Sequence, residues 1–581
     1  LLLLLLLVLA PLAFASSHYT FEHAEEMRYS GRIDWQDYGP DPFNQAVEEN
    51  KPIFLLLSAP SWCYWCHVYT SDDYVYHPDV YPTINQNFIP IYVDADKRQD
   101  LTRKYLEGGW PSTTVMTPNG DRLFGYSGPR PIQNMLVNLN QAVEHVNTNG
   151  FANTISYQYQ NTTPIIPNPN QLNGLINGYA AYTLQSYDSL HGGFGSGQKF
   201  PQGRALDFAL EIYETAQDQQ FLDLVQNTLV NQYTQIDELE TNYNLYDPVE
   251  GGFHRYGTQR DWTPPHYEKM LYDNAKLLRV YAHLQQLTPN DEIVDEVVEK
   301  THNYIKTSWY DPKGGFYGNT DVHGEHHYYA KNPRPDEKPR VEKTKYTDWN
   351  TEAILTYLSL WQQTENNEYK EMAEKSLDFF SKEIVTDKGP YHYIKEDGSK
   401  GVRGNLLDNA FMLLAFTEGY AVLEKQDYLD TANQIAQYSL DNLYDWNSGG
   451  FFERNSQDLH LYAPGENIDL SQPNEENAII AYALLKLYQQ TGNIEYLNAG
   501  LKTLGKKISG VGGLDSGYYF VKSAQLVLEG NLLSEYNNNL IEIERLEQEK
   551  LANFWVNDLV VNQEPVEPFV VSDEGIEKLQ A

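Results

Sequence analysis

The sequence has little cysteine, few basic residues and no long apolar segment. Only two cysteines occur among 581 residues, which excludes a fold held together by several disulfides. Lys and Arg total 42 against 80 Asp and Glu, and the formal net charge is −38. A chain this acidic repels phosphate backbones and anionic lipid, so we expect no nucleic-acid partner and no polybasic docking to membranes. After the first 15 residues, no apolar run approaches the roughly 20 residues of a membrane-spanning helix.

What the sequence does have is length and aromatic residues. Because single domains usually hold about 100 to 200 residues, a chain of 581 predicts two or more domains. Hydrophobic residues make up 41%, and there are 45 Tyr and 10 Trp. Aromatic side chains in this number can build a large core or line a pocket for flat or sugar-like ligands.

The amino end is an uncharged apolar run, Leu1 to Ala15, that closes in Ala13-Phe14-Ala15 before Ser16. A short apolar stretch followed by a small-x-small site is typical of a secretory signal peptide. We therefore predict a signal peptide at residues 1–15 and a periplasmic or secreted mature protein that begins near Ser16. The alternative is an uncleaved membrane anchor.

Strands and helices alternate in the first predicted domain, residues 18–149. The run I-F-L-L-L-S has the length and continuous hydrophobicity of a buried central strand. Asn119-Gly120 is a hairpin signal between two later strands. We predict strands at 53–58, 88–94, 113–117 and 122–126, and helices at 101–106 and 131–147.

Both cysteines, Cys63 and Cys66, follow the first of these strands at C-x-x-C spacing. At a helix start, we expect the first thiol to be exposed and its thiolate to be stabilised by the helix dipole. The second thiol would then form or resolve a disulfide. Two alternatives stay open, a static structural disulfide and half of a zinc site, for which only histidines could supply the other ligands.

This order of elements resembles a thioredoxin fold, and Pro111 in Gly108 to Ser112 (G-G-W-P-S) matches the cis-proline of that fold. The segments W-C-Y-W-C-H-V and D-A-D-K-R-Q-D resemble the thioredoxin-like domain of the spermatogenesis-associated protein 20 family, also called DUF255. The resemblance implies redox roles for Cys63, Cys66 and Pro111, with the disulfide as the only cofactor and protein thiols or disulfides as partners. Leu57 stands where thioredoxins carry a buried acid, and Val68 departs from the family's motif.

A loop signature, Tyr-Asp followed by Gly-Gly-Phe, recurs through residues 164–530. The first glycines of its copies stand at 192, 251, 314 and 449, with weaker copies at 389 and 512. A period near 60 residues with helical spacing between the loops indicates one helical hairpin per repeat. Six hairpins predict an all-α (α/α)6 toroid of the six-hairpin glycosidase-like type, followed by a small cap at 531–581.

Polar residues cluster where each inner helix should begin, and all these starts should share one face of the toroid. Helix capping explains part of this polarity, Asp348 included. We expect His266, Met270 and Asp273 to share one helical face. The candidate pocket residues are His254, His266, Glu268, Asp273, Asn274, Asp408 and Glu476, and no metal site is expected.

The toroid segment also resembles the same family, through F-P, P-H-Y-E-K-M-L-Y-D-N-A, D-W-N and L-D-N-A. Its barrel type is shared with sugar 2-epimerases, which use histidines, and with glycosidases, which need two opposed carboxyls. A burial-raised pKa would mark the general acid. We expect residues 324–345 to be a surface insertion.

Three hypotheses follow from the sequence. The first is an exported thiol-disulfide oxidoreductase with a recognition barrel. The second is a carbohydrate-active enzyme with a structural thioredoxin domain and a saccharide-like ligand. The third is a binding protein with neither activity.

Overall fold

The structure of the protein, a computed structural model, describes residues 31–150, 165–234, 244–320, 326–329, 333–336, 338–454, 471–508 and 513–552. The predicted signal peptide at 1–15 lies outside these ranges, as do residues 553–581 of the predicted cap. The described residues fall into two compact units. The first is drawn from Leu1–Pro60, Trp65–Ala95 and Leu101–Phe151, and the second from Ser61–Tyr64, Asp96–Asp100 and Ala152–Ala581.

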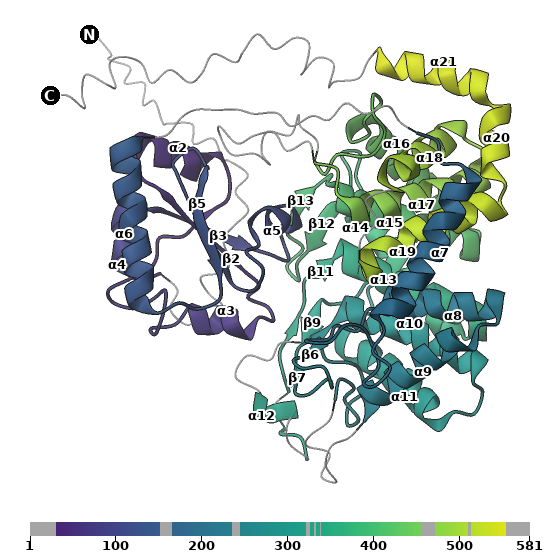
Figure 1. The fold of residues 1–581 in the computed structure, drawn as a ribbon, viewed down its shortest axis with the longest axis horizontal. Helices are drawn as coiled ribbons and strands as arrows, with labels where there is room; N and C mark the ends of the chain where they lie inside the picture. The colour runs from purple at the N-terminus through teal and green to yellow at the C-terminus, as the bar shows by residue number, and fades with distance from the viewer. Residues whose placement is uncertain are drawn as a thin grey trace, which may run out of the picture. The chain divides into compact units, whose positions relative to one another are not determined.

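A five-stranded mixed sheet is the centre of the first unit, in the order β1-β3-β2-β4-β5. Three of its strands, β2, β3 and β5, are labelled in Figure 1. β1, β3 and β2 run parallel, whereas β4 pairs antiparallel with both β2 and β5. All six residues of β2 are buried, as expected of a central strand that is covered on both faces. The strands are β1 (Gln36–Asp37), β2 (Ile53–Ser58), β3 (Ile89–Asp94), β4 (Ser112–Met116) and β5 (Arg122–Ser127).

Helices cover this thioredoxin-like sheet. α6 buries Met135, Leu139, Ala142 and Val146, which recur every three or four residues. The four predicted strands and both predicted helices are present. β1, α2 and α4 were not anticipated, although Pro40 at the first position of α2 is a helix-start signal. The helices are α2 (Pro40–Glu49), α3 (Tyr64–Tyr69), α4 (Tyr81–Asn87), α5 (Gln99–Tyr105) and α6 (Ile132–Asn149).

Six inner helices form a closed ring in the second unit. Each packs against the next along the chain, and the last, α19, packs against the first, α8. This is the predicted (α/α)6 architecture. The inner helices are α8 (Gly203–Ala216), α10 (Leu271–Leu287), α13 (Thr347–Thr364), α15 (Leu406–Leu423), α17 (Asn474–Thr491) and α19 (Leu514–Glu529).

Six outer helices back this ring, five of them following their inner partner. The sixth, α7, precedes the first inner helix in the chain and packs against α19. A five-residue π-helical turn, Ile305–Trp309, extends α11. The outer helices are α7 (Pro169–Ser186), α9 (Gln219–Tyr233), α11 (Glu292–Tyr304), α14 (Asn367–Glu383), α16 (Gln426–Asn442) and α18 (Ile494–Lys507).

The two ends of the ring differ in their connections. At the short-turn end, where inner helices finish, two residues separate α8 from α9 and α13 from α14. The caps Gln217 and Glu365 adopt the left-handed conformation that ends many helices. At the long-loop end, the chain forms short strands before the inner helices begin. These are β6 (Tyr256–Gly257), β7 (Pro265–His266), β8 (Lys269–Met270), β9 (Asn319–Thr320), β10 (Val341–Glu342), β11 (Lys345–Tyr346), β12 (Tyr391–Ile394) and β13 (Lys400–Arg403).

Among the helices that the structure describes, α15 alone has the length and apolar composition to cross a membrane, and 72% of it is buried. A helix that is apolar on every side is also what the interior of a ring requires.

Two expectations about the second unit need correction. The segment 324–345 is not only surface, because it brings Arg334 into an ion pair with the buried Asp247 and buries Tyr329 at the end of α12 (His326–Tyr329). The single polar helix that the sequence predicts over residues 532–551 is two helices, α20 (Leu532–Asn538) and α21 (Leu540–Leu551), separated by Asn539.

Candidate functional site

Cys63 and Cys66 are joined in a disulfide at the start of α3, and the Trp110–Pro111 peptide bond is cis. The expected exposure of the first sulfur is wrong, because Cys63 is only 4% exposed. Residues 61–64 are held by the second unit, to which they belong. The Trp62 indole N–H donates to Asp96 Oδ2 at 2.8 Å.

The Gly-Gly-Phe loops are held to the ring by buried ion pairs. In three repeats a lysine Nζ donates to the aspartate of the Tyr-Asp pair at 2.8 Å, and the same Nζ donates to the carbonyl of the first glycine. The pairs are Lys199–Asp188, Lys269–Asp247 and Lys345–Asp311. Gly251 lies so close to Lys300 that an added Cβ would stand 2.4 Å from its carbonyl oxygen, which explains a glycine there.

In three of the Gly-Gly-Phe loops, an asparagine near the start of an inner helix holds the phenylalanine. Asn274 Oδ1 accepts from the Phe253 N–H at 2.6 Å, and its Nδ2 donates to the carbonyl oxygens of Phe253 and Met270 at 2.9 Å each. Asn350 and Asn477 repeat this arrangement on their own loops. Asn274 therefore binds the loop backbone and is not a pocket residue. We call the lysine and asparagine contacts that hold a Gly-Gly-Phe loop in this way the loop clamp.

His254 is a buried neutral side chain. Its Nδ1–H donates to the Tyr267 carbonyl at 2.8 Å, and its ring packs edge-on against Tyr267 and Tyr329. Burial and the nearby Lys269 ammonium lower its pKa to about 3. An imidazole that stays uncharged between two tyrosines braces this loop.

The remaining candidates from this stretch surround Arg255. His266 pairs through Nδ1 with Glu268 Oε2 and stacks on Tyr256, with ring centroids 4.8 Å apart. The other oxygen of Glu268, Oε1, is buried without a hydrogen-bond partner. The Arg255 guanidinium lies 3.7 Å from the centroid of the Trp62 ring. Burial opposes the charge of Arg255, but negative neighbours, Glu268 and Asp273 among them, outweigh burial and raise its pKa.

The predicted helical face is wrong, because α10 begins only at Leu271. His266 lies in β7 and Met270 in β8, so only Asp273 is helical. What joins Asp273 to His266 is therefore the shared neighbourhood of Arg255 and not a common helix.

Asp273 has the burial-raised pKa expected of a general acid. Burial raises its pKa to about 6, against the opposing charges of Lys276 and Arg255. Lys276 Nζ lies 3.5 Å from Asp273 Oδ1 and 3.4 Å from Asp515 Oδ2, so it bridges carboxylates of α10 and α19. Asp515 was not predicted.

Asp408 is paired with a histidine that sequence reasoning missed. His392 Nδ1 donates to Asp408 Oδ1 at 2.7 Å, and its Nε2 donates to the Asp96 carbonyl at 2.7 Å. Burial lowers the pKa of His392, but Asp408 and Asp348 outweigh burial and raise it to about 10. Burial, together with Asp408, raises the pKa of Asp348 to about 6. Glu476 is buried in the first turn of α17.

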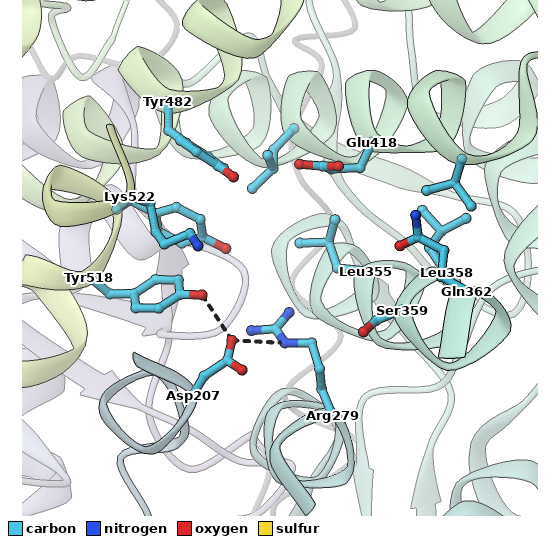
Figure 2. A pocket seen from close by; sticks show the side chains of 13 residues that line it. Asp207, Arg279, Leu355, Leu358, Ser359, Gln362, Glu418, Tyr482, Tyr518 and Lys522 are labelled. Atoms are coloured by element: carbon cyan, nitrogen blue, oxygen red, sulfur yellow. Dashed lines mark hydrogen bonds and ion pairs between the residues drawn. The ribbon is translucent and has the colours of Figure 1, made fainter. Parts of the chain in front are cut away.

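A cavity of about 300 Å³ lies within the ring, lined by residues of all six inner helices (Figure 2). Its polar lining includes Asp207, Arg279, Glu418, Tyr482, Tyr518 and Lys522. None of the seven predicted barrel residues lines it. Its residues lie near the middle of most inner helices, and only on α13 and α15 do they extend toward the short-turn end. Within the described part of the chain, no group of three or more His, Cys, Asp or Glu side chains is placed to hold a metal ion.

The chain thus joins a thioredoxin-like domain to an (α/α)6 ring. A family model named Thioredox_DsbH and described as "Protein of unknown function, DUF255" matches residues 10–160. The chain is 25% identical to the Caenorhabditis elegans protein B0495.5 over 83% of this chain and 80% of that protein. It is 26% identical to human spermatogenesis-associated protein 20 over 59% of this chain and 44% of that protein, so the match spans less than half of the human relative. These matches support the resemblance to that family.

Solved structures that resemble the chain have lower sequence identity than these relatives. A D-mannose isomerase is 12% identical with a TM-score of 0.49, covering 64% of this chain and all of that chain. A cellobiose 2-epimerase from Spirochaeta thermophila is 18% identical with a TM-score of 0.45, covering 57% and 84%. Likenesses at this level say nothing about the substrate of the present chain.

Proposed function

We propose that the chain is an exported thiol-disulfide oxidoreductase that acts through Cys63 and Cys66. The observation that carries the proposal is the disulfide at the start of α3, the helix that follows the central strand β2 of a thioredoxin-like sheet. The export part of the proposal is supported by the apolar run at residues 1–15 and its A-F-A site.

The proposed exchange conserves electrons and atoms. A substrate thiolate attacks the Cys63 sulfur, forming a mixed disulfide and releasing Cys66 as a thiolate. A second substrate thiol, once deprotonated, attacks the substrate sulfur of the mixed disulfide and releases the Cys63 thiolate. The substrate is oxidised to a disulfide, and the cysteine pair gains two electrons. The same steps in reverse reduce a substrate disulfide.

Burial of Cys63 adds a requirement to this chemistry. Attack needs an open path to the sulfur, so residues 61–64 must loosen before exchange. The contacts that hold them are the hydrogen bonds from Trp62 and Ser61 to Asp96 and the cation-π contact of Trp62 with Arg255.

Single-cysteine variants test the proposal. Cys66→Ser, incubated with oxidised glutathione, should trap a mixed disulfide at Cys63, because the resolving thiol is gone. Cys63→Ser is the matched control and should trap far less. Mass spectrometry of the intact chain reads out both. A structural disulfide is indicated instead if neither variant gains glutathione and the native pair does not titrate in a glutathione buffer.

A second candidate function is binding of a saccharide-like ligand at the long-loop end of the ring. The observation that favours it is the Arg255 surroundings: the buried free oxygen Glu268 Oε1, the partly exposed His266 ring and the protonatable Asp273. Carboxylate oxygens, a guanidinium and tyrosine faces are groups that can bind hydroxyls and the apolar faces of sugars. Turnover would give Asp273 the role of general acid, because its pKa of about 6 allows it to hold a proton near neutral pH.

Isosteric variants test this second function. Glu268→Gln and Asp273→Asn should weaken binding across a panel of glycans while leaving the fold intact. Glycan binding that stays unchanged while the melting temperature falls would assign both residues to the scaffold. Binding without any conversion of the glycans would leave a binding protein rather than an enzyme.

A further inference from the structure

The cavity of the ring belongs to neither of the sites proposed above. Three kinds of side chain line it. Carboxylates and cations face it from α8, α10, α15 and α19, tyrosines from α17 and α19, and aliphatic side chains from α13 and α15 (Figure 2). Its volume of about 300 Å³ is at the lower end of small-molecule pockets, which hold roughly 300–1,000 Å³.

The charged groups of the cavity are already neutralised by neighbours. Arg279 Nε lies 3.4 Å from Asp207 Oδ2, which also accepts a hydrogen bond from the Tyr518 hydroxyl at 2.9 Å. Lys522 Nζ pairs with Glu211 Oε1 at 2.7 Å. Glu418 pairs with Lys486. A charged ligand would have to break one of these pairs and leave its partner uncompensated in a buried site, which is strongly unfavourable.

A neutral ligand would not meet this cost. Lone pairs of the Glu418 and Asp207 carboxylates and N–H groups of Arg279 can still take part in hydrogen bonds while their ion pairs persist. Hydroxyl groups suit such a site because each can donate to a carboxylate and accept from a guanidinium.

Three tyrosines form the flat part of the wall. Tyr519 packs against Tyr518 with centroids 5.0 Å apart and against Tyr482 with centroids 5.7 Å apart. The Arg204 guanidinium lies 5.0 Å from the Tyr519 ring centroid. The Tyr482 hydroxyl points toward the cavity in Figure 2 and has no hydrogen-bond partner among the described residues. It is therefore a polar group available to a ligand.

We propose that this cavity binds a small, neutral, hydroxyl-rich ligand of polyol or monosaccharide size. Tyr482 donates or accepts a hydrogen bond from it, and Glu418 and Arg279 bond further hydroxyls. The aliphatic or ring face of the ligand packs against the tyrosines and against Leu355 and Leu358 of α13. This site is separate from the Arg255 surroundings at the long-loop end.

Calorimetric titration of the full chain tests the site with two sets of probes. The neutral probes are myo-inositol, D-glucose and D-mannose. The charged probes are D-glucuronate and D-glucosamine. At least one neutral probe should bind, and the charged probes should bind about tenfold more weakly or not at all. Failure of all neutral probes, or preference for a charged one, overturns the proposal.

Substitutions then locate the binding. Tyr482→Phe removes only the hydroxyl and should weaken the bound neutral probe about tenfold. Tyr182→Phe is its matched control on α7, where that ring is 45% exposed, and should leave affinity unchanged. Leu358→Trp, which fills the cavity without removing a polar group, should abolish binding. A melting curve for each variant establishes that the ring is intact.

The long-loop variant Glu268→Gln separates this proposal from the second candidate function. Binding of the neutral probe should survive this substitution. The cavity proposal is overturned if Glu268→Gln abolishes binding while Tyr482→Phe and Leu358→Trp leave it intact, a result that would support the long-loop site. Neither outcome bears on thiol-disulfide exchange, which the cysteine variants test separately.

Discussion

The long-loop end of the ring and the middle of the ring use polar side chains for different purposes. At the long-loop end, lysine, aspartate and asparagine bind loop backbone, as Lys269, Asp247 and Asn274 do around one Gly-Gly-Phe turn. Midway along the inner helices, charged side chains pair with one another and still face a cavity, as Asp207 and Arg279 do. The most motif-like residues of the ring are thus mainly architectural, whereas the cavity is lined by residues without any motif.

A repeated polar motif in a ring of this kind is a sign of architecture before it is a sign of chemistry. A side chain that recurs from repeat to repeat serves a need that the repeats share, which is to hold a loop to its helix. A ligand contacts a ring asymmetrically, so its residues need occur only once. By this reasoning Asp515, His392 and Glu268, each outside the repeated clamp, are better candidates for chemistry than Asn274.

The largest expected effect comes from breaking a loop ion pair. Lys269→Met should lower the free energy of unfolding by about 3–5 kcal/mol, because it leaves the Asp247 carboxylate buried with only Arg334 as a cationic partner. Chemical denaturation measures this. Lys375→Met on α14 is the control, because that lysine makes an exposed pair with Glu371 and its loss should leave stability nearly unchanged. Equal effects of both variants would contradict the clamp.

Two amide side chains at opposite ends of α13 should differ in how much they contribute to stability, and this is the second largest expected effect. Asn350→Ala at the long-loop end of α13 should cost about 2–4 kcal/mol, since it removes the partners of the buried Phe316 N–H and carbonyl. Gln362→Ala at the short-turn end of the same helix should stay within about 0.5 kcal/mol. Comparable losses from the two substitutions would show that the ends of the ring do not differ in this way.

The smallest of these effects depends on pH. His392→Gln keeps hydrogen-bonding capacity toward Asp408 but loses the charge, and should cost about 1–2 kcal/mol near neutral pH. The pKa of His392 is raised in the folded chain from 6.5 to about 10. Its ionisation therefore stabilises the fold fully below pH 6.5, and this contribution is lost as pH rises through 10.

Urea unfolding of both proteins at pH 6 and at pH 10 measures the difference. The gap between wild type and His392→Gln should shrink at the higher pH. A gap that is constant, or that widens with pH, would show that the His392–Asp408 pair is not ionic.

Much of the fold could be predicted because its signals are local and repeated. The run from Ile53 to Ser58 is a buried strand with the predicted bounds. The four Gly-Gly-Phe copies and the two weaker copies correctly predicted six inner helices. α2 and α4 were missed because they are short and lack a long apolar period. The contribution of α7 to the last hairpin was missed because it depends on ring closure, which no local pattern reports.

The site was less predictable than the fold. His266, Glu268 and Asp273 do share a neighbourhood, but through Arg255 and two short strands rather than through one helical face. His392 follows a weak copy of the loop motif, so nothing in its surroundings marked it. Asp207 and Tyr518 hydrogen-bond across the join of the first and last inner helices, a contact that sequence spacing cannot reveal.

Closure of the ring also depends on segments that the ribosome synthesises far apart in time. Asp207 on α8 and its partner Tyr518 on α19 are 311 residues apart in the chain. At a synthesis rate of roughly 5–20 residues per second, about 15–60 s pass between the synthesis of α8 and that of α19. Over that time the flank of α8 that α19 later covers, with Ala205, Leu206 and Phe208 nearby on the same helix, cannot complete its packing. Folding that depends on so distant a contact is slow and leaves apolar surface open to aggregation. A nascent chain stopped before residue 514 should therefore bind chaperones that recognise apolar segments more strongly than the finished ring does.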